Sequence, residues 1–287
     1  MEIGIGLPNP IRGVEGRTLI EWARRAEEAS FSSLATIDRI AYPSYESLIT
    51  LAAAAGITER IELMTNVLLG PTRNPVLLAK EAASVDQLSG GRLVLGLGVG
   101  GRPDDYEAVG ERFDDRGRRW DEALELIVRT WRGENLDPGE SAVGPAPLRP
   151  EGVRVLIGGM SEKSIARTIA WGIGWTAGGA PPEQVAPFVE RVRSAWKKAG
   201  REGQPHIVAL SYFSLGDDVT EASRAYLKDY YGFTGEFAEM IADAAPRTPE
   251  AIREVVGKFE DIGVDELVFD PTVAELTQVD RLAEAVT

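Results

Sequence analysis

The segment RLVLGLGVGGRPDDYEAVG, residues 92–110, decides between two parallel α/β folds. It opens with a strand-like run and continues with three glycines in the pattern G-x-G-x-x-G, which is typical of dinucleotide-binding folds. In those folds the glycines open a helix, and an acidic residue about 20 residues further on, after the next strand, holds the ribose. Here Pro103 follows at once, and the acids at that distance, Asp121 and Glu122, fall inside an amphipathic helix. This context argues against dinucleotide binding.

The rest of the chain alternates short β-rich runs with amphipathic helical runs from end to end. We predict eight strands, at residues 2–8, 32–38, 61–68, 92–100, 153–159, 174–179, 206–216 and 266–271. The helices expected between them include residues 18–30, 75–88, 118–131, 161–171 and 183–199, and one that starts at the Thr248 cap. Such alternation implies a parallel sheet covered by helices, which is either a closed (β/α)8 TIM barrel or an open doubly wound sheet. No flexible linker or short repeat divides residues 1–287, so we expect a single domain.

Two segments are longer than an ordinary connection. Residues 133–152 are rich in Pro and Gly and are predicted to form a long loop that leads to the fifth strand. Residues 216–246 follow the seventh strand and carry helical patterns with several Tyr and Phe residues. This helical insertion is expected to be a lid, a dimer contact or plain packing.

Composition excludes several classes of function. Apolar residues make up 44% of the 287 residues, which is enough for a full core, and the net charge of -14 disfavours nucleic acid as a partner. No apolar run approaches the roughly 20 residues that span a bilayer, and the start of the chain lacks signal-peptide features, so we expect a cytoplasmic protein without a membrane partner. The chain has no cysteine and one histidine, so no metal site is predicted.

The histidine and the acids that end strands limit the possible chemistry. His206 opens the seventh strand and would lie at the N-terminal end of a barrel, opposite the usual active site, so we interpret it as structural. A hydrolase would need paired catalytic carboxylates at strand ends. Only Asp38 and Asp270 end strands convincingly, and no motif joins them.

Two long blocks carry a family resemblance: TNVLLGPTRNPVLLAKEAASVDQLSGGRLVLGLGVGGRPDDYEAVG at 65–110 and VLIGGMSEKSIARTIAWGIGWTAGG at 155–179. With them the chain resembles the bacterial luciferase-like flavin-dependent oxidoreductases over nearly its whole length. The family fold is a TIM barrel of the α/β class, which agrees with the strand count. The resemblance implies that FMN or the deazaflavin coenzyme F-420 binds at the C-terminal mouth.

The resemblance also implies which residues bind the cofactor. Thr65 and Asn66 match a bulge of the third strand behind the isoalloxazine ring, where relatives often have a non-prolyl cis peptide. Gly98 and Val99 end the fourth strand, where small residues leave room for a flat ligand or simply permit a tight turn. The loops that hold the phosphate in relatives correspond here to Gly158, Gly159, Met160, Ser161, Gly178 and Gly179. Ser161 precedes a helix and suits either phosphate binding or capping alone.

The catalytic candidates lie in the loops after the second and fourth strands. Asp38 matches an Asp-His pair of many relatives, but Arg39 stands where their histidine would be. That change puts the histidine-dependent reactions of the family in doubt. Tyr106 is the other candidate, because a phenol can both donate a hydrogen bond and stack.

Arginines occur in the loops after the first four predicted strands: Arg12, Arg39, Arg73 and Arg102. All four would lie at the mouth of a barrel whose net charge is strongly negative. We predict that they form a positive rim that attracts an anionic cofactor tail or an acidic substrate, although four loop arginines can also occur by chance.

The sequence as a whole predicts a flavin-dependent oxidoreductase. The first expectation is a monooxygenase that uses reduced FMN and oxygen on a small organic substrate. One alternative is a coenzyme F-420-dependent dehydrogenase or reductase that transfers hydride, and another is a flavin-binding barrel without catalysis. The resemblance further implies a homodimer and a separate flavin or F-420 reductase as partners.

Overall fold

The eight strands close into a parallel barrel in the order β1 to β8, with β8 hydrogen bonded to β1. This computed structural model describes residues 1–135 and 141–287. The strands are β1 Glu2–Gly6, β2 Ser33–Thr36, β3 Glu62–Leu69, β4 Leu93–Gly98, β5 Arg154–Gly158, β6 Gly174–Thr176, β7 His206–Phe213 and β8 Glu266–Pro271. The closed order confirms the predicted TIM barrel and excludes the open doubly wound sheet.

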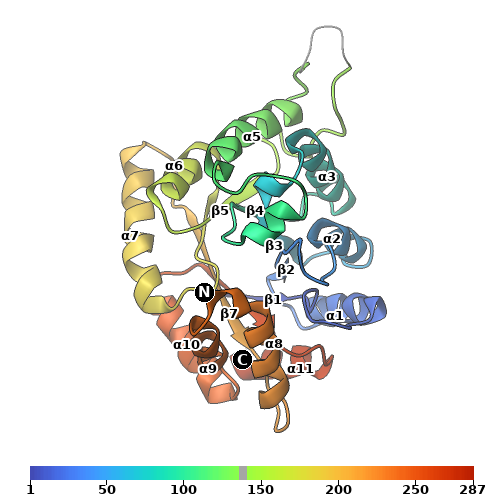
Figure 1. Cartoon of the computed structure of the whole chain (residues 1–287), viewed down its shortest axis with the longest axis vertical. Coiled ribbons are helices and arrows are strands. Elements are labelled where there is room, and N and C mark those ends of the chain that lie inside the picture. Colours follow the sequence, from blue (N-terminus) through green and yellow to red (C-terminus); the bar gives the residue numbers. More distant parts are fainter. Residues whose placement is uncertain (136–140) are drawn as a thin grey trace.

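Helices surround the barrel and connect successive strands (Figure 1). They are α1 Gly16–Glu28, α2 Ser47–Ala55, η1 Gly70–Thr72, α3 Pro75–Leu88, α4 Pro103–Glu107, α5 Arg116–Trp131, α6 Glu162–Trp171, α7 Pro182–Lys198, α8 Thr220–Tyr230, η2 Gly232–Thr234, α9 Phe237–Ala244, α10 Pro249–Asp261 and α11 Thr277–Val286. Local sequence explains several starts. The Asn74 side chain accepts the N–H groups of Val76 and Leu77, both at 3.0 Å, and Thr248 caps α10 in the same way.

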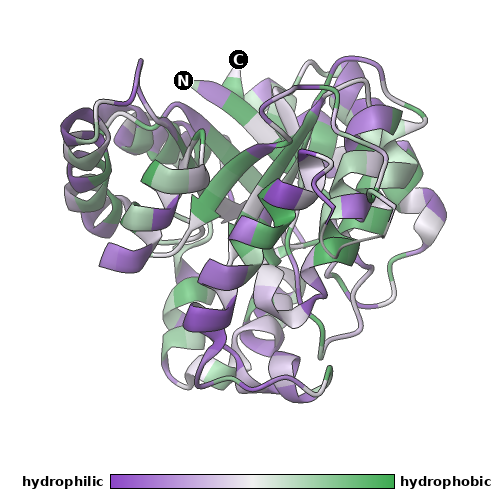
Figure 2. Cartoon of the chain, turned by 90° about the horizontal axis from the view of Figure 1, so that it is seen from above, coloured by the Kyte–Doolittle hydropathy of each residue, from purple (hydrophilic) through white to green (hydrophobic). Residues whose placement is uncertain are grey.

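The core has two parts because strand residues alternate in direction. Outward-facing strand residues pack against the helices, whose outer surfaces carry the hydrophilic residues in Figure 2. A small apolar layer fills the barrel interior: Ala35, Met64, Val94, Leu156, Val208 and Val268. Inward-facing residues beyond this layer therefore end at one of the two openings of the barrel.

The differences from the predicted elements lie at their ends. The sixth strand stops at Thr176, before the glycines that were included in the prediction, and the structure adds α2, α4 and α11 to the expected helices. Within the predicted loop 133–152, the described residues form no helix or strand, and 136–140 lie outside the described residues. The predicted insertion after β7 folds into α8, η2 and α9. No helix in the described ranges is both long and apolar enough to cross a bilayer.

Candidate active site at the barrel mouth

The third strand is bulged at the C-terminal end of the barrel, which is where barrel active sites lie. Its register against β4 shifts between Thr65 and Leu68, and the peptide between Asn66 and Val67 is cis. The Thr65 hydroxyl donates a hydrogen bond to the Gly96 carbonyl oxygen at 2.7 Å and fixes the bulge to the neighbouring strand. The bulge occurs at the position that the sequence analysis assigned to it.

The bulge directs the Val67 side chain across β4 and β5. A Cβ atom added to Gly98 would lie 2.7 Å from Val67 Cγ2, and one added to Gly158 would lie 2.9 Å from Val67 Cγ1. Both glycines are therefore needed for the valine to lie flat on the two strands. Val67 remains partly exposed, so these three residues form an apolar surface in the mouth, which we call the Val67 platform.

Beside the platform, Asn66 retains an unused hydrogen-bond donor. Its side-chain oxygen accepts a hydrogen bond from the Thr176 hydroxyl at 2.7 Å. Its side-chain nitrogen is buried and has no hydrogen-bond partner among residues 1–135 and 141–287. A buried donor without a partner costs free energy unless a ligand or water completes it, so Asn66 fits a group that carries acceptor atoms.

The predicted phosphate loops lie at the ends of β5 and β6. The Ser161 hydroxyl accepts the Ser164 N–H at 3.1 Å while Ser164 Oγ accepts the Ser161 N–H at 2.9 Å, so the two serines form a capping box for α6. Gly159 and Gly178 both have positive φ angles, of 105° and 59°. Met160 is 42% exposed. The capping role of Ser161 is thus visible in the geometry, and its phosphate role, like that of Gly179, stays a prediction.

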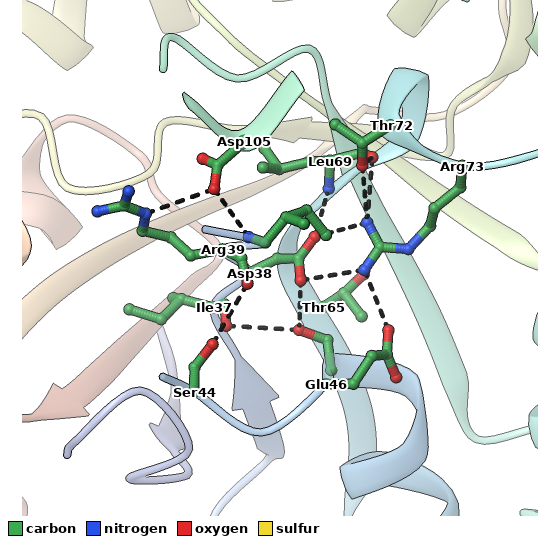
Figure 3. Close-up of polar contacts among 12 residues, drawn as sticks. Ile37, Asp38, Arg39, Ser44, Glu46, Thr65, Leu69, Thr72, Arg73 and Asp105 are labelled. Carbon is green, nitrogen blue, oxygen red and sulfur yellow. Dashed lines mark hydrogen bonds and ion pairs between the residues drawn. The ribbon is translucent and has the colours of Figure 1, made fainter. Parts of the chain in front are cut away.

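Asp38 is held by four donors at the end of β2 (Figure 3). Its carboxylate accepts two hydrogen bonds from the Arg73 guanidinium, at 2.8 and 3.1 Å, and one from the Leu69 N–H at 2.9 Å. Ser47 Oγ donates a fourth at 3.3 Å, and Arg73 also pairs with Glu46 at 3.0 Å. Because the carboxylate is saturated, this arrangement favours a structural role for Asp38 over the predicted catalytic one.

Asp105 joins the loop after β2 to the segment after β4 (Figure 3). One carboxylate oxygen accepts the N–H groups of Ile40 and Ala41, both at 2.8 Å, and lies 3.6 Å from Arg39 Nε. Arg39 also pairs with Asp104 at 2.6 Å. Arg39, in the place of the family histidine, therefore connects two loops by its charge.

Tyr106 is fully buried beneath the same loop. Its hydroxyl donates a short hydrogen bond to the Val99 carbonyl oxygen, and its ring packs edge-on against Phe113 with centroids 5.3 Å apart. Burial raises the pKa of Tyr106 to about 12, so the phenol stays protonated at neutral pH. These contacts position Val99, and they favour a structural role for the tyrosine.

The four predicted rim arginines all lie at the mouth, but three of them are neutralised within the chain. Arg12 pairs with Asp229 of α8 at 2.7 Å, and Arg39 and Arg73 make the ion pairs described above. Opposite charges this close cancel at longer range, so these three attract an external anion only weakly. Anion attraction by the rim stays a prediction and depends mainly on Arg102.

Arg102 contacts aromatic rings instead of an acid. Its guanidinium carbon lies 4.8, 5.6 and 4.4 Å from the ring centroids of Tyr230, Tyr231 and Phe233, and it has no carboxylate partner in the part of the chain that the structure describes. These cation–π contacts connect the loop after β4 to the insertion after β7. Its charge therefore remains uncompensated.

The insertion packs over one side of the mouth. Side chains of α8 and α9 form an apolar cluster with the end of β2 and the inner face of β7: Ile37, Leu210, Tyr212, Tyr226, Leu227, Tyr230, Ala242 and Ala245. The hydroxyls of Tyr212 and Tyr231 lie 2.7 Å apart. We call α8, η2 and α9 together the aromatic cap.

Two inward-facing acids of β8 were not assigned a function from the sequence. Glu266 lies at the N-terminal end of the barrel, where the hydroxyls of Ser32 and Ser33 donate to it, both at 2.6 Å, and His206 Nε2 lies at 3.4 Å. His206 is therefore a structural residue at that end, as its position indicated. Asp270 lies at the mouth, and both of its oxygens are buried without a hydrogen-bond partner among the described residues. The alternation along β8 could have indicated its direction, but no sequence pattern reveals a missing partner.

No group of three or more potential metal ligands occurs in residues 1–135 and 141–287. A closed parallel barrel with a bulged strand, polar side chains and exposed glycine turns at its C-terminal mouth has the organisation of a barrel enzyme. The chain belongs to the luciferase-like monooxygenase family, whose sequence profile matches residues 1–266.

Three proteins are similar to this chain, two in sequence and one in structure. An uncharacterised protein of Mycobacterium tuberculosis is 30% identical over 227 residues, which cover 68% of this chain and 78% of the relative. The FMNH2-dependent dimethylsulfone monooxygenase of Pseudomonas putida is 26% identical over 232 residues, or 76% of this chain and 58% of that protein. The structure of an F-420-dependent secondary alcohol dehydrogenase has the same fold, with a TM-score of 0.79, 18% identity, and coverage of 100% of this chain and 99% of the other.

Proposed function

We propose that this protein is a monooxygenase that uses reduced FMN and oxygen on a small organic molecule. The observation that carries the proposal is the Val67 platform, an apolar surface across β4 and β5 beside the unpartnered Asn66 amide. A planar ring system with carbonyl and nitrogen acceptors is complementary to such a surface, because its face needs apolar contact and its edge needs donors.

The residues of the mouth have distinct roles in this proposal. Val67, supported by Thr65, Gly98 and Gly158, supports the ring, and the Asn66 amide donates a hydrogen bond to it. The turns at Gly159 to Ser161 and at Gly178 and Gly179 hold the phosphate, helped by the N-terminus of α6. The chemistry supplied by bound reduced FMN is the two-electron reduction of oxygen. A separate reductase supplies the reduced cofactor.

The second candidate is a coenzyme F-420-dependent dehydrogenase or reductase. An F-420-dependent alcohol dehydrogenase shares the fold over 99% of its length, which makes it a candidate, although an FMN-bound monooxygenase is matched over 97% of its length as well. The ion pairs of Arg12, Arg39 and Arg73 weigh against the second candidate, because they leave mainly Arg102 to attract a polyanionic cofactor tail. We therefore place reduced FMN first.

The test is a fluorescence titration of the purified chain with FMN, reduced FMN and coenzyme F-420. We expect reduced FMN to bind most tightly, and Val67→Glu to weaken its binding at least tenfold because a carboxylate would replace the apolar surface under the ring. Ile49→Glu, on the exposed surface of α2, is the matched control and should bind like the wild type. Tighter binding of F-420 would favour the second candidate, and binding of neither would contradict both.

A further inference from the structure

Asp270 is a buried acid whose carboxyl group makes no hydrogen bond or ion pair with the described residues. Residues 266, 268 and 270 of β8 alternate with outward-facing ones, so Asp270 points into the barrel above the apolar layer that contains Val268. It is 3% exposed. A Cβ atom on the adjacent Gly6 of β1 would lie 1.6 Å from its Oδ1. The glycine therefore leaves space for this carboxyl group inside the mouth.

The groups that face Asp270 are polar but uncharged at neutral pH. Tyr212 is its register partner on β7, and Tyr226 and Tyr231 of the aromatic cap are near enough to interact electrostatically with it. No Lys, Arg or His of the described residues forms an ion pair with it. Burial raises the pKa of Asp270 well above its ordinary value, and no described cation opposes that shift.

In these surroundings a carboxyl group acts as a hydrogen-bond donor when it is protonated. It then presents an O–H group as well as acceptor oxygens, and it carries no charge beside the tyrosine rings. An anionic ligand would find no described cation in contact with Asp270, because Arg12, Arg39 and Arg73 are paired with acids. The uncompensated Arg102 lies on the rings of the aromatic cap instead. A hydrocarbon would leave the donor unsatisfied. The chemistry that satisfies both features is an uncharged, largely apolar molecule with an acceptor oxygen.

We propose that Asp270 is a substrate-binding residue, which as a neutral carboxylic acid donates a hydrogen bond to the carbonyl oxygen of an uncharged apolar substrate. This inference rests on the proposed function, because it places the substrate beside the cofactor surface in the same mouth. It assigns the β8 and aromatic-cap side of the mouth to the substrate and the β3 to β6 side to the cofactor.

The aromatic cap controls access to Asp270. It is attached to the barrel loops by side-chain contacts, including Arg12 and Tyr42 with Asp229, at 2.7 and 2.5 Å, and Arg102 on the rings of Tyr230 and Phe233. Such contacts can separate without breaking a strand of the sheet. In this proposal, access of a substrate to Asp270 requires these contacts to open and the tyrosines to move aside, because the acid is 3% exposed.

The first measurement determines the protonation state of Asp270 directly. The infrared difference spectrum between the wild type and Asp270→Asn at neutral pH should contain the C=O stretching band of a protonated carboxylic acid. Glu266→Gln is the matched control on the same strand, and its difference spectrum should show a carboxylate band instead. A carboxylate band for Asp270 at neutral pH would overturn the proposal.

The second measurement uses three probes of similar size with the full chain, with and without the cofactor that binds best: acetophenone, benzoate and ethylbenzene. We expect the wild type to bind acetophenone most tightly. Asp270→Leu should weaken acetophenone binding about tenfold and remove its advantage over ethylbenzene, whereas Asp270→Asn, which keeps an N–H donor, should weaken it about threefold or less. Glu266→Gln should bind all three like the wild type.

The outcomes separate this proposal from the proposed function. The role of Asp270 would be overturned if the wild type did not prefer acetophenone over both other probes. It would also be overturned if Asp270→Leu kept that preference. A preference that depends on Asp270 in a chain that binds neither FMN nor F-420 would support the donor site and contradict the cofactor assignment. Cofactor binding without the acetophenone preference would support the cofactor assignment and contradict the donor role of Asp270.

Discussion

Glu266 and Asp270 begin and nearly end the same strand, face the same interior and are both almost fully buried, yet their surroundings are opposite. Glu266 receives hydrogen bonds from two serines and pairs with His206. Asp270 receives none from the described residues. The strand therefore carries one acid whose interactions are completed by the fold and one whose interactions await a ligand.

The pKa values of the two acids shift in opposite directions because hydrogen bonds outweigh the effect of burial at Glu266 but not at Asp270. Burial alone would raise the pKa of Glu266, but the hydrogen bonds from His206, Ser32 and Ser33 outweigh it and lower that pKa below its ordinary value. For Asp270 burial acts without opposition and raises the pKa. The comparison teaches that the N-terminal end of this barrel is organised for stability and the C-terminal mouth for binding, as is usual for the fold.

The largest effect is expected from Glu266→Ala. The change removes the shared acceptor and leaves Ser32, Ser33 and His206 without their partner, which should cost about 3 kcal/mol of unfolding free energy. Urea denaturation at neutral pH measures it, with Glu260→Ala, an exposed acid of α10, as the control. A loss below about 1 kcal/mol would break the comparison, because Glu266 would then not be a stability residue.

An intermediate effect is expected from Gly6→Ala, which sharpens the description of the mouth. The new methyl group would overlap the Asp270 carboxyl, and such overpacking should cost about 2 kcal/mol. Asp270→Ala in the same chain should restore most of that loss, because it removes the overlapping atoms. A thermodynamic cycle of the two single variants and the double variant checks this. Additive effects would show that the two positions do not contact each other.

The smallest effect, and the only one with a favourable sign, is expected from Asp270→Asn. An amide has no ionised form to bury, so at neutral pH this variant should be more stable than the wild type by about 1 kcal/mol. The folded-state pKa of Asp270 lies above its unfolded value of 3.8, so the native state binds more protons and the wild type loses stability as pH rises from there. The advantage should thus be near zero at pH 4 and grow toward pH 8.

The contribution of Glu266 to the free energy of unfolding should change with pH in the opposite direction to that of Asp270. Its folded-state pKa lies below the ordinary value of 4.5, so its stabilising contribution is present above that pH and is lost as the pH falls through the folded-state pKa. Glu266→Gln should therefore lose stability relative to the wild type at neutral pH and approach it in acid. Urea denaturation of both variants from pH 3 to pH 8 makes the comparison, because the contribution of Glu266 is lost only below pH 4.5. Parallel profiles for Asp270→Asn and Glu266→Gln would contradict it.

The sequence predicts the fold better than it predicts the site. Eight alternating strands and a cap such as Thr248 are local patterns, and they predict a parallel sheet covered by helices. The choice of a closed barrel and the position of the bulge at Asn66 came from the family resemblance. Contacts between distant segments cannot be predicted from local patterns. No local pattern indicates that Arg12 pairs with Asp229 or that Arg73 saturates Asp38. The arginines were placed at the mouth correctly, but their neutralisation could not be predicted.

The same limit explains why Asp270 was not among the predicted site residues. Its distinguishing property is the lack of a partner, which depends on Gly6, β7 and the aromatic cap together. Tyr106 is the opposite case. Its residue type suits catalysis, but its hydroxyl already donates a hydrogen bond to the Val99 carbonyl oxygen. Residue chemistry suggests candidates, and packing decides which of them remain available.

The aromatic cap is encoded by one continuous stretch between β7 and α10, whereas the proposed cofactor surface comes from β3 to β6. The aromatic cap and the proposed cofactor surface therefore come from separate parts of the sequence. An insertion, deletion or exchange within residues 216–246 leaves every barrel strand and its order intact. A single change in this stretch can thus alter which molecules reach the mouth, while the proposed cofactor surface stays unchanged.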